Sequence, residues 1–210
     1  LFRSEEAFIG TSMEEITLPA RLTNFNVNIF TSCDELEMVN IEETESGTST
    51  YTSENGVVFT DKGATLYYCP TGRSGKYTIP AQVTRIGERA FYKCVNLEGV
   101  VIPGNVMSIG QEAFYGCQLL SSLVFEGTSK DPELSIGESA FYGCASLSSL
   151  SLPENLKVLE KYAFGNIAGL IKVTVNTTLE EISYDNGAFA DTKGNTYVRT
   201  LVLGPSVRSE

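Results

Sequence analysis

Three pairs of adjacent glutamates are the side chains that sequence alone places best for acid–base chemistry: Glu14-Glu15, Glu42-Glu43 and Glu180-Glu181. Glycoside hydrolysis needs two carboxyl groups held roughly 5–10 Å apart across a substrate. Neighbours on a strand point to opposite faces, so we interpret these pairs as solvated surface. The chain has no histidine, which excludes Ser-His-Asp and Cys-His nucleophiles and histidine metal sites. The sequence therefore predicts no catalytic residue, no metal, no cofactor and no enzymatic activity.

Cysteine is the other reactive residue type, with five copies. Four of them lie three residues after a phenylalanine, namely Cys33, Cys94, Cys117 and Cys144, whereas Cys69 lies outside that pattern. An odd count and the absence of a Cys-x-x-Cys motif argue against a disulfide framework or a zinc site. We expect buried free thiols. The alternative is a disulfide between neighbouring copies such as Cys117 and Cys144, which requires Cα atoms within roughly 7 Å.

These cysteines belong to a short element that recurs along the chain. The element is usually Ala-Phe, then Cys or a small polar residue, then Leu and an alternating apolar triplet. Its phenylalanines are Phe8, Phe30, Phe91, Phe114, Phe141, Phe164 and Phe189, which are separated by 22, 61, 23, 27, 23 and 25 residues. A period in this range predicts a solenoid, because one unit is too small to bury its own apolar face and must stack on its neighbours.

Each unit contains the signals of a strand and of a tight turn. Apolar residues alternate after the Leu, as at Val100 and Ile102 or at Leu150 and Leu152, which predicts a strand with one buried face. A second apolar pair follows, such as Val106 and Ile109. The Ala-Phe segment is too short for a stable helix, so we expect a helical or 3₁₀ turn that inserts the Phe into the core. Stacked units then form a parallel sheet about 4.8 Å apart.

The 61-residue gap predicts an insertion within this solenoid. Residues 57–59 and 64–68 flank a short turn containing Gly63, which is a hairpin signal. A smaller insertion near 127–133 accounts for the 27-residue spacing. We therefore divide one continuous solenoid into N-terminal repeats at 1–41, a hairpin insertion at 42–80 and C-terminal repeats at 81–210. Both ends read as the interior of a repeat, so we expect any leader or anchor to lie outside this sequence.

The unit from Ile86 to Pro103 resembles the BspA-type leucine-rich repeat of bacterial surface proteins. The shared pattern is Ile-Gly-Glu-x-Ala-Phe-x-x-Cys-x-x-Leu-x-x-Val-x-Ile-Pro, and 109–125 and 136–153 repeat most of it. The resemblance implies a β-rich (α/β) solenoid, a right-handed leucine-rich-repeat superhelix with a parallel β-sheet, short helical or 3₁₀ turns and one β-hairpin insertion. It also implies a secreted or cell-surface adhesion module, although such a resemblance argues for a fold better than for a partner.

Charge narrows the class of partner. The net charge is −11, and residues 1–60 carry −9 of it, from 11 acids and 2 bases. Such a chain lacks the basic patch of a nucleic-acid binder and would be repelled by anionic membrane surfaces. No apolar run reaches the roughly 18 residues that a membrane span needs. We expect a protein or glycan partner on a host, a neighbouring cell or the matrix, with no nucleic acid and no direct membrane insertion.

The candidate binding residues are those that point outward from the strands, because solenoids bind partners on such extended surfaces. They are Met38, Asn40, Val101, Val124, Lys172 and Thr174. The row they belong to is mostly small and weakly polar, so a merely soluble face is the alternative. A second candidate is the series Tyr92, Tyr115 and Tyr142, although such a stripe is more often a packed edge with hydrated hydroxyls than a binding surface. The leading hypothesis is thus an extracellular binding module, and the alternative is a spacer that projects another domain.

Overall fold

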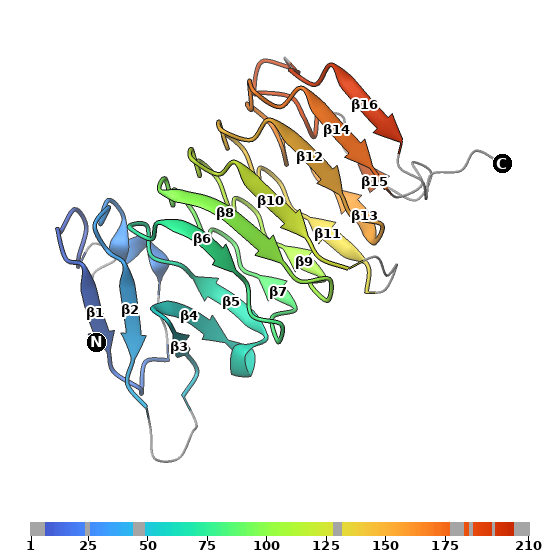
Figure 1. The fold of residues 1–210 in the computed structure, drawn as a ribbon. Coiled ribbons are helices and arrows are strands. Elements are labelled where there is room, and N and C mark those ends of the chain that lie inside the picture. Colours follow the sequence, from blue (N-terminus) through green and yellow to red (C-terminus); the bar gives the residue numbers. More distant parts are fainter. Residues whose placement is uncertain are drawn as a thin grey trace.

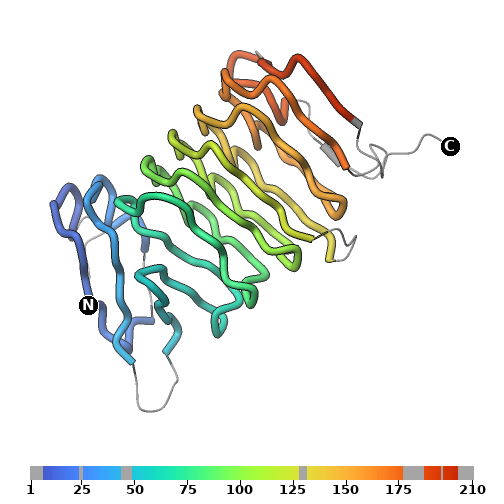
Figure 2. Tube along the Cα trace, viewed as in Figure 1, coloured from blue at the N-terminus to red at the C-terminus, as the bar shows by residue number. Residues whose placement is uncertain are grey.

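The computed structural model describes residues 7–23, 26–43, 49–127, 132–176, 183–184, 187–194 and 196–203. The chain winds into coils stacked along one axis, and the colours of Figure 2 advance steadily from one end of the stack to the other. Each regular coil has a strand on the front of the molecule, a strand on the back and a turn that joins them (Figure 1). The predicted solenoid is therefore confirmed.

The front strands are the alternating segments that the sequence predicts. They form three parallel sheets, β1-β2, β6-β8-β10 and β12-β14-β16, whose outward side we call the front face. The strands are β1 (Glu15–Leu18), β2 (Met38–Ile41), β6 (Gly75–Thr78), β8 (Leu97–Ile102), β10 (Ser122–Phe125), β12 (Ser149–Leu152), β14 (Lys172–Val175) and β16 (Thr200–Leu203). Alternate residues such as Val100 and Ile102 are buried. The front is thus not one continuous sheet, and its two interruptions lie between β2 and β6 and between β10 and β12.

The back sheet has eight strands in the order β15-β13-β11-β9-β7-β5-β4-β3. They are β3 (Thr52–Glu54), β4 (Val57–Thr60), β5 (Thr65–Tyr68), β7 (Arg85–Ile86), β9 (Ser108–Ile109), β11 (Leu134–Ile136), β13 (Leu156–Leu159) and β15 (Ser183–Tyr184). The pairs β3-β4 and β4-β5 are antiparallel and the others are parallel. The antiparallel pair β4-β5, joined by the 3₁₀ turn η2 (Asp61–Gly63), is the predicted hairpin.

Stacked phenylalanine rings fill the core beneath the turns. The rings of Phe91 and Phe114 lie 4.5 Å apart, and the next two steps, to Phe141 and then to Phe164, are 4.8 Å each. These separations match the 4.7–4.9 Å spacing of hydrogen-bonded strands. Because backbone and side chains advance by the same step, each ring meets the next in a stacked arrangement, and all four are at most 1% exposed.

The turns are held by a repeated backbone geometry. The residue two positions before the phenylalanine has a positive φ, as at Arg89 (55°) and Glu112 (53°), and so does the residue two positions after it, as at Lys93 (56°). The phenylalanine N–H donates to the alanine carbonyl of the next coil, as from Phe91 to Ala113 at 2.7 Å. The expected 3₁₀ turn forms as η1 (Val27–Phe30), whereas 88–96 and its equivalents are consecutive turns.

The repeated cysteines complete these turns. The thiol of Cys117 donates to the carbonyl oxygen of Phe91 at 3.1 Å, and that of Cys144 donates to the carbonyl oxygen of Phe114 at 3.3 Å. All five cysteines are buried and free, as expected. A thiol suits this position because it is small and apolar and yet offers a weak donor to the coil before it.

We expect these thiols to resist alkylation in the native protein. Burial raises the pKa of the Cys117 and Cys144 thiols well above the ordinary value, so the reactive thiolate is scarce at about pH 8. Because the pKa of these two thiols is higher in the folded chain than in the unfolded chain, their burial contributes to folding stability at pH values below the ordinary thiol pKa. This contribution is lost as the pH rises toward the folded-state pKa. Iodoacetamide followed by mass spectrometry should find no label on the folded chain and five labels in denaturant. Rapid labelling of Cys117 without denaturant would contradict this packing.

Cys69 lies outside the pattern of the other four cysteines, as the sequence indicates, because it occupies the phenylalanine position of a coil. Its N–H donates to the carbonyl oxygen of Ala90 at 2.7 Å, which is the bond that a repeat phenylalanine makes, and the thiol of Cys94 lies 3.6 Å from its carbonyl oxygen. The gap between Phe30 and Phe91 therefore contains a full coil as well as the hairpin. Tyr68 supplies the aromatic ring of this coil and stacks on Phe30 at 5.6 Å.

This coil has a shorter turn than its neighbours. Tyr77 follows Leu66 by 11 residues, whereas Val100 follows Ile86 by 14, although the two pairs occupy matching positions in the sheets. At Gly72 the shortened turn packs closely against the preceding coil, because an added Cβ there would lie 2.7 Å from the backbone of Glu35. The turn of this coil consequently projects less far from the core than the turns of the coils on either side.

Candidate functional site

The six predicted binding residues lie on the front face in three groups. Val101 on β8 and Val124 on β10 are direct cross-strand neighbours. Lys172 and Thr174 share β14, where they pair with Ser149 and Ser151 of β12. Met38 and Asn40 share β2 and pair with Glu15 and Thr17 of β1, and the Asn40 amide donates to the Glu15 carboxylate at 2.5 Å.

The group on β2 is separated from the rest by the tip of the β3-β4 turn. Val39 donates its N–H to the carbonyl oxygen of Gly56 at 3.0 Å, so this tip lies against β2. A Cβ added to Gly56 would lie 2.8 Å from Met38, which leaves no space between them. Arg73 fixes the tip from the other side by donating to the carbonyl of Asn55. Met38 and Asn40 therefore do not form one continuous surface with Val101.

The second interruption, between β10 and β12, leaves a cleft on the front face. Ile136 follows Leu123 by 13 residues, whereas Ile109 follows Val100 by 9 between matching positions. The four extra residues come directly after β10, in the region where an insertion is predicted. The back strands of these coils stay paired, and so do their turns, where Ser146 donates to Gln118 at 3.1 Å. The coils therefore separate only along the front.

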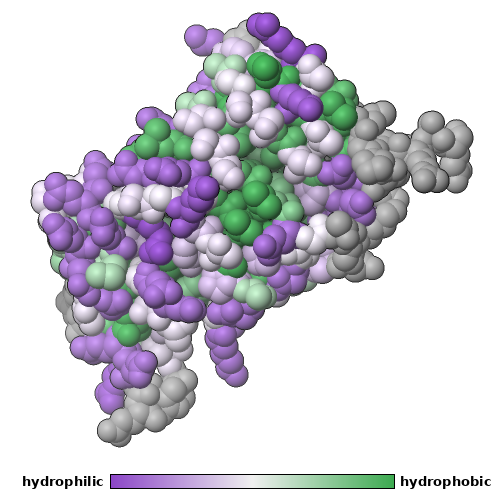
Figure 3. All heavy atoms as spheres, in the orientation of Figure 1, coloured by the Kyte–Doolittle hydropathy of each residue, from purple (hydrophilic) through white to green (hydrophobic). Residues whose placement is uncertain are grey.

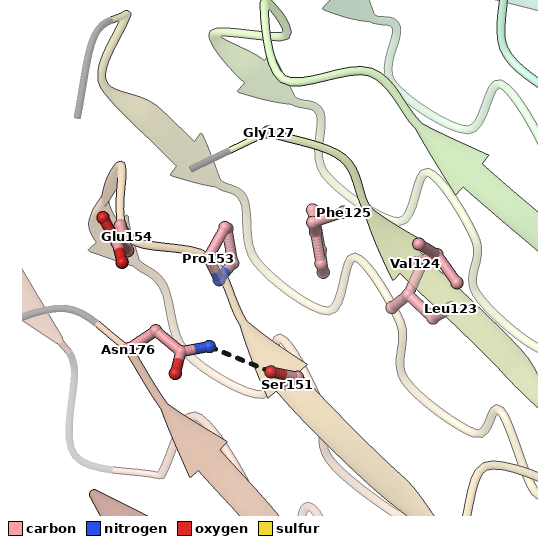
Figure 4. A pocket seen from close by; sticks show the side chains of 8 residues that line it. All are labelled: Leu123, Val124, Phe125, Gly127, Ser151, Pro153, Glu154 and Asn176. Atoms are coloured by element: carbon pink, nitrogen blue, oxygen red, sulfur yellow. Dashed lines mark hydrogen bonds between the residues drawn. The ribbon is translucent and has the colours of Figure 1, made fainter. Parts of the chain in front are cut away.

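The cleft has a volume of about 400 Å³ and combines an apolar wall with a polar one. Leu123, Val124 and Phe125 line it from β10, as Figure 4 shows. On the opposite side, Asn176 donates from its amide to the hydroxyl of Ser151 at 2.9 Å and to the carbonyl of Leu152 at 2.9 Å. These two bonds fix the polar wall in place.

An apolar patch borders this cleft on its β10 side. Val124 is 44% exposed, and Leu123 and Phe125, at the positions equivalent to the buried Val100 and Ile102, are only partly buried. Figure 3 shows apolar atoms gathered near the middle of this face, over β8 and β10, among mostly polar surroundings. An exposed apolar patch rimmed by polar groups is typical of an interaction site. Val101 and Val124, which the sequence predicts as binding residues, belong to it.

Sequence reasoning missed the other residues of this cleft. Leu123 and Phe125 read as core because they occupy the inward positions of the repeat, and nothing in their own type shows that the neighbouring strand is displaced. Neither Ser151 nor Asn176 is among the six candidate binding residues. The longer spacing after Phe114 was the available signal.

The glutamate pairs considered for acid–base chemistry lie on the surface wherever the structure describes them. Among the described residues, no group of three or more His, Cys, Asp or Glu side chains could hold a metal ion. Of the three glutamate pairs, Glu180-Glu181 lies outside the described residues, and the other four side chains are exposed. Across the same described ranges, no helix has the length and apolar character needed to cross a membrane.

A family model for the BspA-type leucine-rich repeat region matches six copies over residues 3–56 and 64–196. The chain belongs to the BspA-type leucine-rich repeat family. The resemblance seen in the sequence is thereby confirmed, and the second matched segment starts at Ala64, where the chain enters β5. Families of this fold are generally not catalytic.

Two solved structures share the fold over nearly the whole chain. A leucine-rich cell surface protein from Faecalibacterium prausnitzii A2-165 is 27% identical, with a TM-score of 0.71 over 94% of this chain and 49% of that one. The pneumococcal vaccine antigen PcpA is 19% identical, with a TM-score of 0.60 over 91% of this chain and 56% of that one. This chain thus spans about half the length of each. No curated protein sequence matches it.

Proposed function

We propose that this chain is a non-catalytic binding module of a bacterial cell-surface protein, and that it recognises a protein or glycan outside the cell. The observation that carries the proposal is the cleft between β10 and β12, where the repeat opens and exposes apolar side chains that other coils bury. A solenoid that served only as a spacer would have no need of such an opening. The name of the Faecalibacterium protein, a cell surface protein, supports the location.

The binding surface that we propose consists of Val101, Val124 and the walls of the cleft. Leu123 and Phe125 supply apolar area that a partner can bury, and Ser151 and Asn176 supply a fixed polar edge. Such an arrangement of an apolar centre with a polar rim is common in specific interfaces. Lys172 and Thr174 lie two strands further along and would extend the same surface. Met38 and Asn40, behind the β3-β4 tip, would contact only a larger partner.

An array of matrix proteins and glycans tests this proposal. We expect saturable binding by the wild-type chain and at least a tenfold loss of affinity in the double variant Val101→Glu, Val124→Glu, because two carboxylates would have to be desolvated in the interface. Both side chains point outward, so the melting temperature should change little. Thr17→Glu on β1, exposed on the same face but far from the cleft, is the matched control. Unchanged binding by the double variant would contradict this location of the site.

The alternative role as a spacer predicts a different result. Deletion of one whole coil would then leave the activity of the parent protein intact, and neither the wild-type chain nor its variants would bind any probe on the array. Because the solenoid is modular and Ile109 pairs with Ile136, removal of the coil from Gly110 to Ile136 joins equivalent positions. Loss of binding in this deletion, with folding retained, would favour the binding module.

A further inference from the structure

A second concave site lies on the turn side of the solenoid, where the coil containing Cys69 has its shortened turn. The groove there has a volume of about 470 Å³. One wall comes from η1 and the residues that follow it, and the other comes from the turns that contain Tyr92 and Tyr115. This volume is within the roughly 300–1,000 Å³ typical of small-ligand sites. The groove shares no lining residue with the cleft on the front face.

Aromatic rings form the floor and one wall of this groove. Phe30 and Tyr68 are buried beneath it, with their rings 5.6 Å apart. Tyr92 and Tyr115 line the wall half-buried, stacked at 5.3 Å with their planes 18° apart, and Tyr115 continues to Tyr142 at 5.3 Å. The wall is thus a rigid aromatic surface that needs no rearrangement to receive a ligand.

An ion pair fixes this wall. The Arg89 guanidinium donates to the Glu112 carboxylate at 2.6 Å and lies over the Tyr92 ring, with Cζ 5.3 Å from its centroid. The hydrogen bond to Glu112 raises the pKa of Arg89. Because Glu112 belongs to the next coil, the pair links the turns that carry Tyr92 and Tyr115. Arg89 therefore supports the aromatic wall, and its charge is already balanced.

Polar side chains with unused hydrogen-bonding capacity lie along the same groove. Asn28 and Asp34 extend from one wall and Lys93 and Gln118 from the other, and all four are exposed. Among the described residues, none of these four side chains has a hydrogen-bond partner, although the Lys93 ammonium lies over the Tyr92 ring, 5.5 Å from its centroid. The carboxylate of Asp34 and the ammonium of Lys93 balance each other in formal charge, so the groove offers both donors and acceptors without a net preference for an ion.

We propose that this groove binds a short neutral oligosaccharide. Pyranose rings present apolar C–H faces, which pack on aromatic rings, and hydroxyl groups, which need both donors and acceptors at their edges. The rings of Tyr92 and Tyr115, beside amide, carboxylate and ammonium groups that have no hydrogen-bond partner, meet both requirements. Proline-rich peptides also dock in aromatic-lined grooves, but a proline residue has no N–H to donate and no polar side chain. The four polar side chains around the rings therefore favour a sugar.

The inference rests on the proposed role as a binding module but assigns its own site, so the two can fail separately. The test is a titration of the full chain against neutral hexose and N-acetylhexosamine oligosaccharides, with sialylated glycans, sulfated glycans and proline-rich peptides as further probes. The informative variant is Asp34→Ala combined with Lys93→Gly. Position 93 has a φ of 56°, and the equivalent positions are Gly116 and Gly143, so glycine fits the backbone there. The fold should therefore be retained.

We expect the double variant to lose neutral-glycan affinity by at least tenfold. Asn166→Gly, which makes the same kind of change at the equivalent position of another turn with a φ of 53°, should leave affinity unchanged. Tyr92→Phe, which keeps the ring, should weaken binding only a few-fold. Absence of neutral-glycan binding, preference for peptides or charged glycans, or full affinity in the double variant would overturn the inference. Glycan binding lost in Val101→Glu, Val124→Glu but kept in the groove variant would overturn it while supporting the front-face site.

Discussion

Replacing Phe114 with alanine should destabilise the chain by about 3–5 kcal/mol, the usual cost of deleting a fully buried aromatic side chain. Phe114 is 0% exposed and is stacked on both sides, at 4.5 Å from Phe91 and 4.8 Å from Phe141. The flanking turns are joined through backbone hydrogen bonds such as Phe114 to Ala140, so the coils cannot close over the lost ring without breaking them. The cavity should therefore persist.

Thermal unfolding checks this prediction. A loss of this size corresponds to a fall in melting temperature of roughly 6–20 °C for a chain of this length. Phe189→Ala is the matched control, because Phe189 is only partly buried and its described ring neighbour in the stack, Phe164, lies at 5.9 Å. We expect a clearly smaller change there. A melting temperature for Phe114→Ala within about 2 °C of wild type would contradict the stacked core.

Gly110→Ala should also be strongly destabilising, by about 1–3 kcal/mol from overpacking. A Cβ at this position would lie 2.6 Å from the backbone nitrogen of Glu88 and 2.8 Å from the carbonyl carbon of Gly87. Both atoms belong to the backbone of the preceding coil, so no side chain can move aside. Gly137 has the same constraint, with 2.9 Å to the nitrogen of Gln111. The repeat uses glycine here to let one coil approach the next.

Gly169→Ala separates this steric effect from the general effect of replacing glycine. A Cβ there would be 3.5 Å from its nearest neighbours, which is an ordinary contact. We expect Gly169→Ala to be neutral or to stabilise by up to about 1 kcal/mol, because alanine restricts the unfolded chain. Urea denaturation of the two variants compares them directly. If Gly110→Ala and Gly169→Ala were equally stable, the coils that meet at Gly110 would be able to move apart more than their hydrogen bonds indicate.

The sequence predicts the regular part of this fold because the regular part is local. Alternation at Val100 and Ile102 indicates a strand wherever the pattern occurs. The recurrence of phenylalanine at similar intervals, as from Phe91 to Phe114, indicates stacking. Buried free cysteines follow from the same periodicity. The position of Cys69 could not be predicted in this way, since it is a phenylalanine position by hydrogen bonding and not by residue type.

The candidate site is harder to predict because it depends on pairing between distant segments. Val101 and Val124 can be predicted because they occupy outward-facing positions of their strands. The cleft beside them requires β10 and β12 to separate, and that separation depends on two coils together. Leu123 occupies a core position of the repeat but is only partly buried. Similarly, the groove beside Tyr92 arises from a turn elsewhere in the chain. Departures from the repeat, in length more than in composition, locate both openings.

The most direct test of the proposed role is a quantitative titration of the strongest array ligand against the wild-type chain, Val101→Glu with Val124→Glu, and Thr17→Glu, with melting temperatures measured in parallel. The account predicts saturable binding that falls at least tenfold in the double variant alone, with all three proteins equally folded. Saturable binding that is the same in all three, or no binding to any protein or glycan probe, would contradict a recognition surface at the β10-β12 cleft.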